Sequence, residues 1–410
     1  MLRSPAPSLY LPIGNNQRTG NHSALLGAAF LMATSAIGPG FLTQTAQFTA
    51  DLGASFGFVI LISILLDIGA QLNIWRVITL SELHAQDLAN RLLPGLGLAL
   101  ACLIGFGGLA FNIGNMAGCG LGLQALTGLD PRAGAALSCI AGLALFWFRE
   151  AGRRMDAFAK ILGLLMVGLT CYIAFVSRPP LADALYRTIW PAQTDVLKII
   201  TLVGGTVGGY ISFAGAHRLL DAHIKGPEAL PQVTRSAVTG ILLTSLMRFV
   251  LFLAALGVVA QGVSLGSGNP AASVFRAAGS LGYRFFGLVM WCAAITSVVG
   301  ASYTSVSFFK TLHPVLEKHE RLIISMLIIT ATVAFVFLGK PVRLLVLAGA
   351  VNGLILPLAL SVVLVAAARS KIMGTYRHPL WMQAAGWAVV AVLSWMSLRV
   401  LSELWPASWS

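Results

Sequence analysis

Charged residues are scarce in this 410-residue sequence. They make up 10% of the chain, whereas hydrophobic residues make up 57%. A soluble domain carries about 25% charged residues, so this chain has too little polar side chain to cover a soluble globule. The formal net charge of +13 comes from 27 Lys and Arg against 14 Asp and Glu, and the basic residues lie in short loops between apolar runs. This distribution favours a protein of the lipid bilayer over one that binds nucleic acid.

Cysteine motifs and catalytic motifs are also missing. The five cysteines lie inside apolar runs with no Cys-X-X-Cys pair, which is typical of small buried residues rather than of a metal site or disulfide framework. No glycine-rich phosphate loop precedes a Lys-Ser or Lys-Thr pair, and no paired carboxylates lie in a soluble domain. The sequence therefore predicts neither an enzyme nor a bound cofactor.

Long apolar runs fill most of the chain. A membrane-spanning helix needs about 20 apolar residues, and the runs predict an all-α membrane protein with about eleven such helices. Residues 1–22 are rich in Pro, Asn and Ser and lack the features of a signal peptide, so we expect a flexible cytoplasmic tail followed by one transmembrane domain at 23–410. The predicted spans lie near residues 24–52, 54–80, 97–124, 133–149, 156–177, 197–222, 236–261, 284–312, 321–339, 341–368 and 380–401.

The positions of Lys and Arg predict the topology. With the N-terminus inside, most of these residues lie on the cytoplasmic side, and the segments Arg149–Lys160 and Arg369–Arg377 contribute most of the bias. Cytoplasmic loops carry the excess of positive charge in membrane proteins. We therefore expect a multi-pass protein of the inner (plasma) membrane with a cytoplasmic N-terminus.

The first predicted span is long and is interrupted at its middle by Gly38-Pro39-Gly40. Proline lacks an amide hydrogen and clashes with the preceding turn, and glycine does little to hold helical geometry. Phe41 follows the interruption, and polar side chains come next at Thr43, Gln44, Thr45 and Gln47. We predict that these residues line a substrate site.

The sixth span contains five glycines between Gly204 and Gly215. Such a segment does not hold a straight helix without help from its neighbours. The two interrupted spans are five apart, as two inverted five-helix repeats require, and paired broken helices mark the central site of secondary transporters. The alternative is a plain kink in the first span and glycines that serve close helix packing in the sixth. Candidate substrate-binding residues at the second break are Gly208, Gly209, Tyr210 and Ser212.

Five segments resemble the NRAMP-like transporters of the amino acid–polyamine–organocation superfamily, and the resemblance covers most of the chain. They are Gly38–Ala46 (GPGFLTQTA), Gly69–Arg76 (GAQLNIWR), Gly208–Ala222 (GGYISFAGAHRLLDA), Thr296–Ser305 (TSVVGASYTS) and Asn352–Pro357 (NGLILP). The resemblance implies a LeuT-like fold with broken first and sixth helices, repeat one at about 23–177, repeat two at about 197–368 and an extra helix at about 380–401. It adds Thr304 and Asn352 as further residues that would line the site.

The chain departs from the metal-transporting members of that family at both breaks. Those proteins carry Asp-Pro-Gly-Asn in the first span and Met-Pro-His in the sixth, and the Asp, Asn and Met ligate the metal. Here Gly38-Pro39-Gly40-Phe41 stands at the first position and Ser212-Phe213-Ala214 or its neighbours at the second. An alternative alignment places the first break around Thr45–Phe48, which supplies no acid either. The resemblance therefore implies a transporter without its usual metal ligands.

The side chains at the two breaks indicate which class of substrate the protein binds. Hydroxyls and amides do not neutralise a buried divalent cation, whereas the N-terminal ends of broken helices attract a carboxylate. We expect a small carboxylate, amide or amino-acid-like solute, and gene neighbours of the related branch point to 5-oxoproline. The alternatives are a divalent metal ion (Mg, Mn or Fe) and a sensor that binds without transport.

Ionisable residues inside the spans are candidates for proton coupling or gating. His217 titrates near neutral pH and has Asp221 one turn further along the same helix. Asp67 needs a partner from another span, and Arg248 is the candidate, either in a proton relay or in a structural ion pair. Glu82, Leu83, His84 and Asp87 are expected to form a solvated polar face. The residues predicted to act in coupling or gating, with a proton as possible co-substrate, are His217, Arg218, Asp221 and Asp67.

Overall fold

The computed structural model describes residues 38–265, 268–310 and 314–404, and the regular elements in these ranges are helical. Residues 1–37, including the tail and the first half of the first predicted span, lie outside the described ranges. The helices are α2 (Pro39–Leu52), α3 (Phe56–Ser81), α4 (Ala85–Leu92), α5 (Leu96–Thr127), α6 (Pro131–Trp147), α7 (Arg149–Val176), α8 (Leu181–Ile189), α9 (Val196–Thr206), α10 (Gly209–Asp221), α11 (Leu230–Ala260), α12 (Pro270–Phe275), α13 (Gly279–Lys310), α14 (Pro314–Lys318), α15 (Glu320–Leu338), α16 (Pro341–Ala367), α17 (Ser370–Met373) and α18 (Leu380–Leu404).

The predicted spans are confirmed as helices within the described residues. Nine segments there are long and apolar enough to cross a membrane; one of them, Pro39–Ser81, contains both α2 and α3, and α6 is a shorter apolar helix. The sixth span is broken, because α9 ends at Thr206 and α10 begins at Gly209. The chain is therefore an all-α, multi-pass membrane protein.

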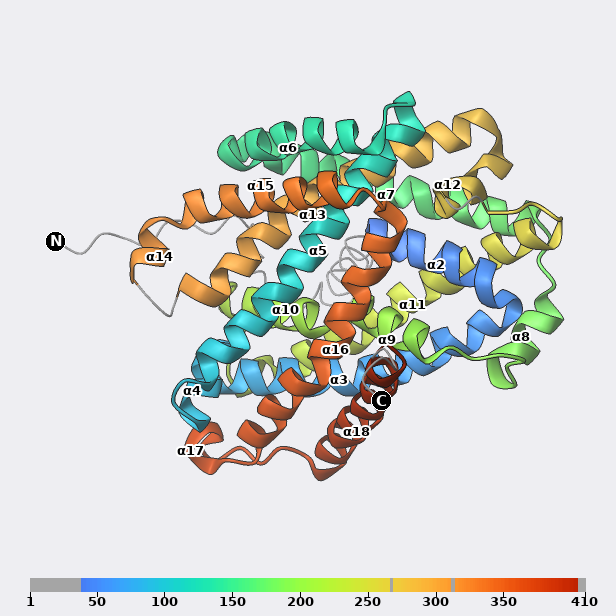
Figure 1. The fold of residues 1–410 in the computed structure, drawn as a ribbon. Coiled ribbons are helices and arrows are strands. Elements are labelled where there is room, and N and C mark those ends of the chain that lie inside the picture. The colour runs from blue at the N-terminus through green and yellow to red at the C-terminus, as the bar shows by residue number, and fades with distance from the viewer. Residues whose placement is uncertain (1–37, 266–267, 311–313, 405–410) are drawn as a thin grey trace, which may run out of the picture.

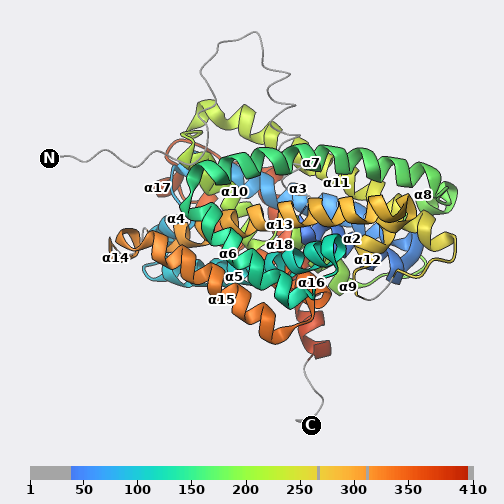
Figure 2. The ribbon, with the colours of Figure 1, turned by 90° about the horizontal axis from the view of Figure 1, so that it is seen from above.

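Several long helices, such as α3 and α7, run lengthwise through the molecule, whereas α5 and α16 cross it obliquely (Figures 1 and 2). Helices α4, α14 and α17 lie at one end and α8 and α12 at the other. Local signals explain where several helices start. Asp130, Asp195 and Asn269 each accept a backbone N–H at the start of α6, α9 and α12, which satisfies a donor that the helix itself leaves free.

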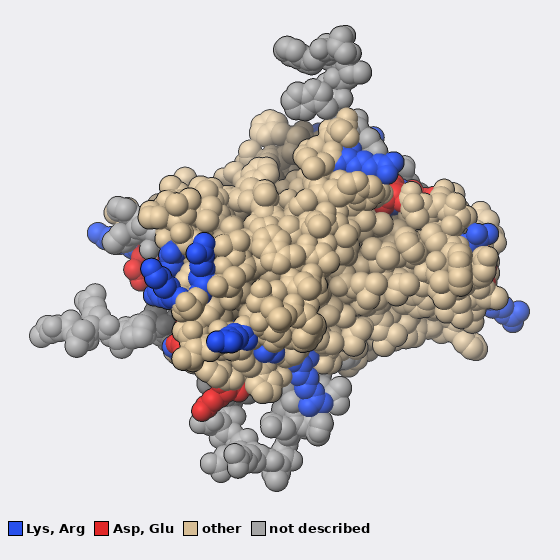
Figure 3. Space-filling view, turned by 90° about the horizontal axis from the view of Figure 1, so that it is seen from below, with Lys and Arg blue, Asp and Glu red and all other residues tan. Residues whose placement is uncertain are grey.

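The surface between the two ends is apolar. Figure 3 shows a broad area without Lys, Arg, Asp or Glu, with charged side chains mostly towards the margins of the view. Large side chains such as Phe175 and Phe337 are more than four-fifths exposed, which in water would be unfavourable but suits contact with lipid. In the interior, α5 packs along α13 and α16, and α9 packs along α16. This packing brings α2, α9, α11 and α16 together around the two breaks.

Candidate functional site

The first predicted break, at Gly38 and Pro39, coincides with the start of the described chain and of α2. Gly38 is extended (φ −91°, ψ 177°) and Pro39 is the first residue of α2, a position at which the missing N–H of proline costs nothing. Helix α2 then continues without interruption to Leu52. The alternative register, which places the break around Thr45–Phe48, is wrong, because those residues lie in the middle of this helix.

Two polar side chains of α2 are buried next to this break. Gln44 donates from Nε2 to the backbone carbonyl of Leu345 on α16 at 3.2 Å. Its Oε1 atom and the Oγ1 atom of Thr43 are buried, and neither has a hydrogen-bond partner in the described part of the chain. A buried polar atom without a partner is unfavourable in the empty protein, so these two atoms are available to a bound solute.

The other predicted polar residues of α2 are used within their own helix. Thr45 donates its hydroxyl to the carbonyl of Phe41 at 2.7 Å, and Gln47 donates to Asp51 at 2.9 Å. Gln47 is only half-buried. The structure thus brings Thr43 and Gln44 to the break, but it gives Thr45 and Gln47 other partners.

The second break consists of Val207 and Gly208, between α9 and α10. Asn352 on α16 accepts the backbone N–H of Tyr210 at 3.0 Å and donates to the carbonyls of Gly107 and Ala348 at 3.0 and 2.9 Å. One of the free N–H groups at the start of α10 therefore already has a protein partner. Asn352, predicted as a residue that lines the site, caps the broken helix.

Neighbouring side chains also have protein partners at this break. The hydroxyl of Ser212 donates to the carbonyl of Val207 at 2.5 Å, and Trp75 donates to the carbonyl of Ser212 at 3.0 Å. Tyr210 donates its hydroxyl to the carbonyl of Ala301 at 3.0 Å. The polar groups at the second break therefore hold α10 against α3, α13 and α16.

Glycines let α9 approach α16 closely. A Cβ at Gly204 would collide with the backbone of Gly349 and Gly353, and a Cβ at Gly209 would collide with Ile355. A Cβ at Gly205 would lie 2.6 Å from Oε1 of Gln44. The glycines of the sixth span thus serve close helix packing, as the alternative interpretation of that span held, in addition to forming a break.

Arg248 on α11 lies between the two breaks. Its guanidinium carbon is 4.5 Å from the centre of the Phe41 ring, next to the first break, and Nη1 donates to the hydroxyl of Thr206, the last residue before the second break, at 2.8 Å. The side chain is 2% exposed. Nε and Nη2 have no hydrogen-bond partner in the described residues, so the edge of the guanidinium that binds carboxylates in a bidentate manner is unoccupied.

Asp67 on α3 is also buried, and both of its carboxylate oxygens lack hydrogen-bond partners in the described chain. Helix α3 packs against α11, which carries Arg248. No hydrogen bond joins Asp67 to Arg248 in the described residues, and their partnership stays a prediction.

The remaining predicted residues gather at the α4 end of the molecule. The Nε2 atom of His217 accepts the backbone N–H of Ala85 at 3.0 Å, and its ring packs at 4.6 Å against that of His84. His84 also lies 3.9 Å from a carboxylate oxygen of Asp221. Arg218 donates to the Thr304 hydroxyl at 3.4 Å. His84 is therefore packed against α10 rather than part of a freely solvated face, which corrects that expectation; Glu82, in contrast, is exposed and pairs with Lys225.

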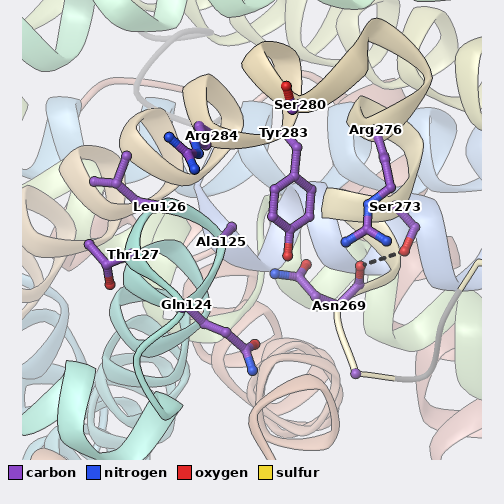
Figure 4. A pocket seen from close by; sticks show the side chains of 12 residues that line it. Gln124, Ala125, Leu126, Thr127, Asn269, Ser273, Arg276, Ser280, Tyr283 and Arg284 are labelled. Atoms are coloured by element: carbon purple, nitrogen blue, oxygen red, sulfur yellow. Dashed lines mark hydrogen bonds between the residues drawn. The ribbon is translucent and has the colours of Figure 1, made fainter.

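A pocket of about 690 Å³ opens at the C-terminal end of α5 and the start of α13 (Figure 4). Its charged lining residues are Arg276 and Arg284, and Tyr283 lies between them in the view. The guanidinium of Arg276 is 4.6 Å from the centre of the Tyr283 ring. Helix α12, which precedes Arg276, packs against α2. This basic pocket therefore lies close to the helix that begins at the first predicted break.

Sequence reasoning did not place Arg248 or Thr206 between the two breaks, and it did not predict the contact of His84 with α10. The only signal for Arg248 was a charge within an apolar run, which indicates an important residue but not its neighbours. Thr206 and Phe41 become its partners through packing of three separate helices.

A span broken between α9 and α10, in a bundle of apolar helices that encloses buried polar groups, is typical of membrane transporters of the LeuT type. The chain belongs to the natural resistance-associated macrophage protein-like (Nramp) family, whose model matches residues 29–403. It is 56% identical over 395 residues to a Bacillus subtilis membrane protein, YcsG, with 96% of this chain and 98% of that protein covered.

Two solved structures share the fold. A manganese transporter of Eremococcus coleocola superimposes with a TM-score of 0.69 at 16% identity, covering 94% of this chain and 89% of that one. MhsT in complex with L-phenylalanine superimposes with a TM-score of 0.62 at 18% identity, covering 92% and 97%. At these identities the superpositions show the fold alone, and they confirm the predicted LeuT-like fold. The predicted NRAMP-like transporter is confirmed by the family model.

Proposed function

We propose that this protein is a secondary-active carrier of a small organic carboxylate, with 5-oxoproline as the model substrate, in the inner membrane. The observation that carries this proposal is the Nε–Nη2 edge of Arg248, which is buried between the two breaks and has no hydrogen-bond partner among the described residues. Arginine stays charged in proteins, and its planar edge matches a carboxylate with two parallel hydrogen bonds. A solute carboxylate satisfies both nitrogens at once.

The neighbouring groups fit the rest of such a solute. Oε1 of Gln44 accepts an N–H, and the hydroxyl of Thr43 can donate to a carbonyl or accept an N–H. 5-Oxoproline carries one carboxylate and one ring amide, so it offers a partner to each of these groups. The ring of Phe41 lies against the guanidinium and would cover the apolar part of the 5-oxoproline ring.

The pocket lined by Arg276 and Arg284 supports a negatively charged substrate. With the N-terminus inside, as Lys and Arg predict, the pocket with Arg276 and Arg284 lies on the outer side. Two arginines at an entrance raise the local concentration of anions.

The second candidate function is transport of a divalent metal ion, favoured by the fold shared with a manganese transporter. MhsT shows that this fold also holds an amino acid. At the breaks of this chain a divalent ion would meet the positive charge of Arg248 in a medium of low dielectric constant, which repels it. The side chains therefore favour an anion over a dication.

Uptake by purified protein in proteoliposomes tests the proposal. Labelled 5-oxoproline should accumulate under an imposed ion gradient, with Mn²⁺ and Mg²⁺ measured in parallel. An excess of the unlabelled carboxylate should compete, whereas its neutral carboxamide analogue should not. Metal uptake without carboxylate uptake would overturn the proposal, and binding without flux would identify a sensor.

A further inference from the structure

Asp67 needs a compensating charge. It is 1% exposed, and neither carboxylate oxygen has a hydrogen-bond partner in the described ranges. An ionised carboxylate buried in this way is stable only beside a positive charge, and otherwise it takes up a proton. Helix α11, which carries Arg248, packs directly against α3. Arg248 thus has two roles to fill, as counter-charge of Asp67 and as the buried cation between the breaks.

Other charged groups lie on α3 itself and on the helices around it. On α3, Arg76 donates to the hydroxyls of Thr234 and Tyr376. The helices packed against α3 include α2, α4, α8, α9, α10, α11, α16, α17 and α18. Their other charged or titratable side chains lie elsewhere along these helices, and several are paired among themselves: Asp51 with Lys198, Asp183 with Arg187, and His84 with Asp87 and Asp221. The remaining charged or titratable side chains on these helices include Arg91, His217, Arg218, Arg235, Arg343, Lys371 and Arg399.

We infer, on the basis of the proposed function, that Arg248 and Asp67 form an exchange unit in which the substrate carboxylate replaces Asp67 as the counter-charge and Asp67 takes up one proton. In the empty carrier, Asp67 is ionised and balances Arg248. In the loaded carrier, the substrate carboxylate bonds to Nε and Nη2 of Arg248. Asp67 is then uncompensated, and a proton from the solution on the loading side forms an O–H bond to its carboxylate.

The geometry favours this exchange. Thr206 and Phe41 already hold the guanidinium on one edge and one face, so it need not move to bind substrate. The substrate makes hydrogen bonds that Asp67 does not make, and charge-assisted hydrogen bonds are stronger than attraction across space. After release of the substrate, the proton leaves Asp67 on the same side. One anion and one proton cross together, so transport is electroneutral and is driven by a pH gradient rather than by membrane potential.

The first arm of the test compares the wild type with Asp67→Asn, using labelled 5-oxoproline as the probe. In the wild type, binding takes up one proton where Asp67 is ionised in the empty carrier. In that pH range the apparent Kd should rise about tenfold for each unit by which the pH is raised. Asp67→Asn should bind with a Kd independent of pH, exchange labelled for unlabelled substrate, and fail to accumulate it in response to a pH gradient. Asp183→Asn, an acid-to-amide change at an exposed residue of α8, is the matched control and should behave as the wild type.

The second arm reads the carboxyl group directly by infrared difference spectroscopy. Addition of 5-oxoproline to the wild type should produce the absorption band of a protonated carboxylic acid. In the substrate-free carrier, Arg248→Gln should show this band without any ligand, and Arg248→Gln combined with Asp67→Asn should lack it. These spectra need neither transport nor, for the two variants, a substrate.

The outcomes separate the two proposals. Uptake of 5-oxoproline with the same pH dependence in Asp67→Asn as in the wild type overturns the exchange unit and leaves the proposed function standing. Absence of 5-oxoproline binding to the wild type overturns the proposed function. Absence of the band in Arg248→Gln overturns the charge coupling of Arg248 and Asp67, whatever the substrate.

Discussion

The two breaks differ in how far the protein itself satisfies them. At the second break, Asn352 caps α10, and Ser212 and Tyr210 have carbonyl partners. At the first break, Gly38 has no side chain that could cap α2, and buried polar atoms of Thr43 and Gln44 have no hydrogen-bond partner among the residues that the structure describes. The second break is therefore built as a fixed joint between helices, whereas the first leaves groups for a solute. A glycine-rich break alone does not indicate a binding site; its unsatisfied groups do.

The largest effect is expected at Arg248, which touches both breaks. Arg248→Gln removes the charge and the bidentate edge and should weaken carboxylate binding about a hundredfold or more. Arg248→Lys keeps the charge but lacks the planar edge. Its affinity for the carboxylate should therefore lie between those of the wild type and Arg248→Gln. Equilibrium binding of labelled 5-oxoproline measures both variants. An unchanged affinity for 5-oxoproline in Arg248→Gln would show that Arg248 does not bind the substrate.

The next effect concerns packing at the second break. Gly204→Ala places a methyl group against the backbone of α16 and should lower the free energy of unfolding by about 1–3 kcal/mol. The neighbouring Gly205→Ala meets only the flexible end of Gln44, at 2.6 Å, so it should keep its stability and reduce uptake. Thermal unfolding in detergent and uptake assays measure the two properties. Equal loss of stability in both variants would contradict the distinction between Gly204, which packs against α16, and Gly205, which faces the proposed substrate site.

Asn352 should matter for stability more than for affinity. Asn352→Ala leaves the N–H of Tyr210 and the carbonyl of Gly107 without partners, which should cost about 1–3 kcal/mol of the free energy of unfolding. The Kd of the remaining folded protein for 5-oxoproline should change little. A variant with wild-type thermal stability and weakened binding would assign Asn352 to the substrate instead.

Thr43 should show the opposite pattern with the smallest effect. Thr43→Val keeps the shape but removes a hydroxyl that has no partner, so stability should be unchanged or slightly higher. The affinity should fall about five- to tenfold, the worth of one hydrogen bond. Thr49→Val is the matched control on the same helix, because its hydroxyl donates to the carbonyl of Thr45 and should not affect binding. Equal affinities of the two variants would argue against a substrate contact at Thr43.

The sequence by itself determined the helices and the positions of their interruptions. Twenty-residue apolar runs have no alternative to helix in a bilayer, because each backbone group must be satisfied internally. Gly38-Pro39 and Val207-Gly208 interrupt helices for reasons that lie within a few residues of chain. The scarcity of charge likewise predicted a membrane protein without its tertiary structure.

Only the tertiary structure decided which polar groups are used and which are left. Asn352 reaches the N-terminus of α10 from α16, and Arg248 reaches Phe41 and Thr206 from α11. His84 reaches α10 from the segment after α3. These contacts join residues far apart in the chain, and they depend on the register of packed helices. Composition and spacing do not encode that register, because helix rotation within the bundle is set by the sum of all packing contacts.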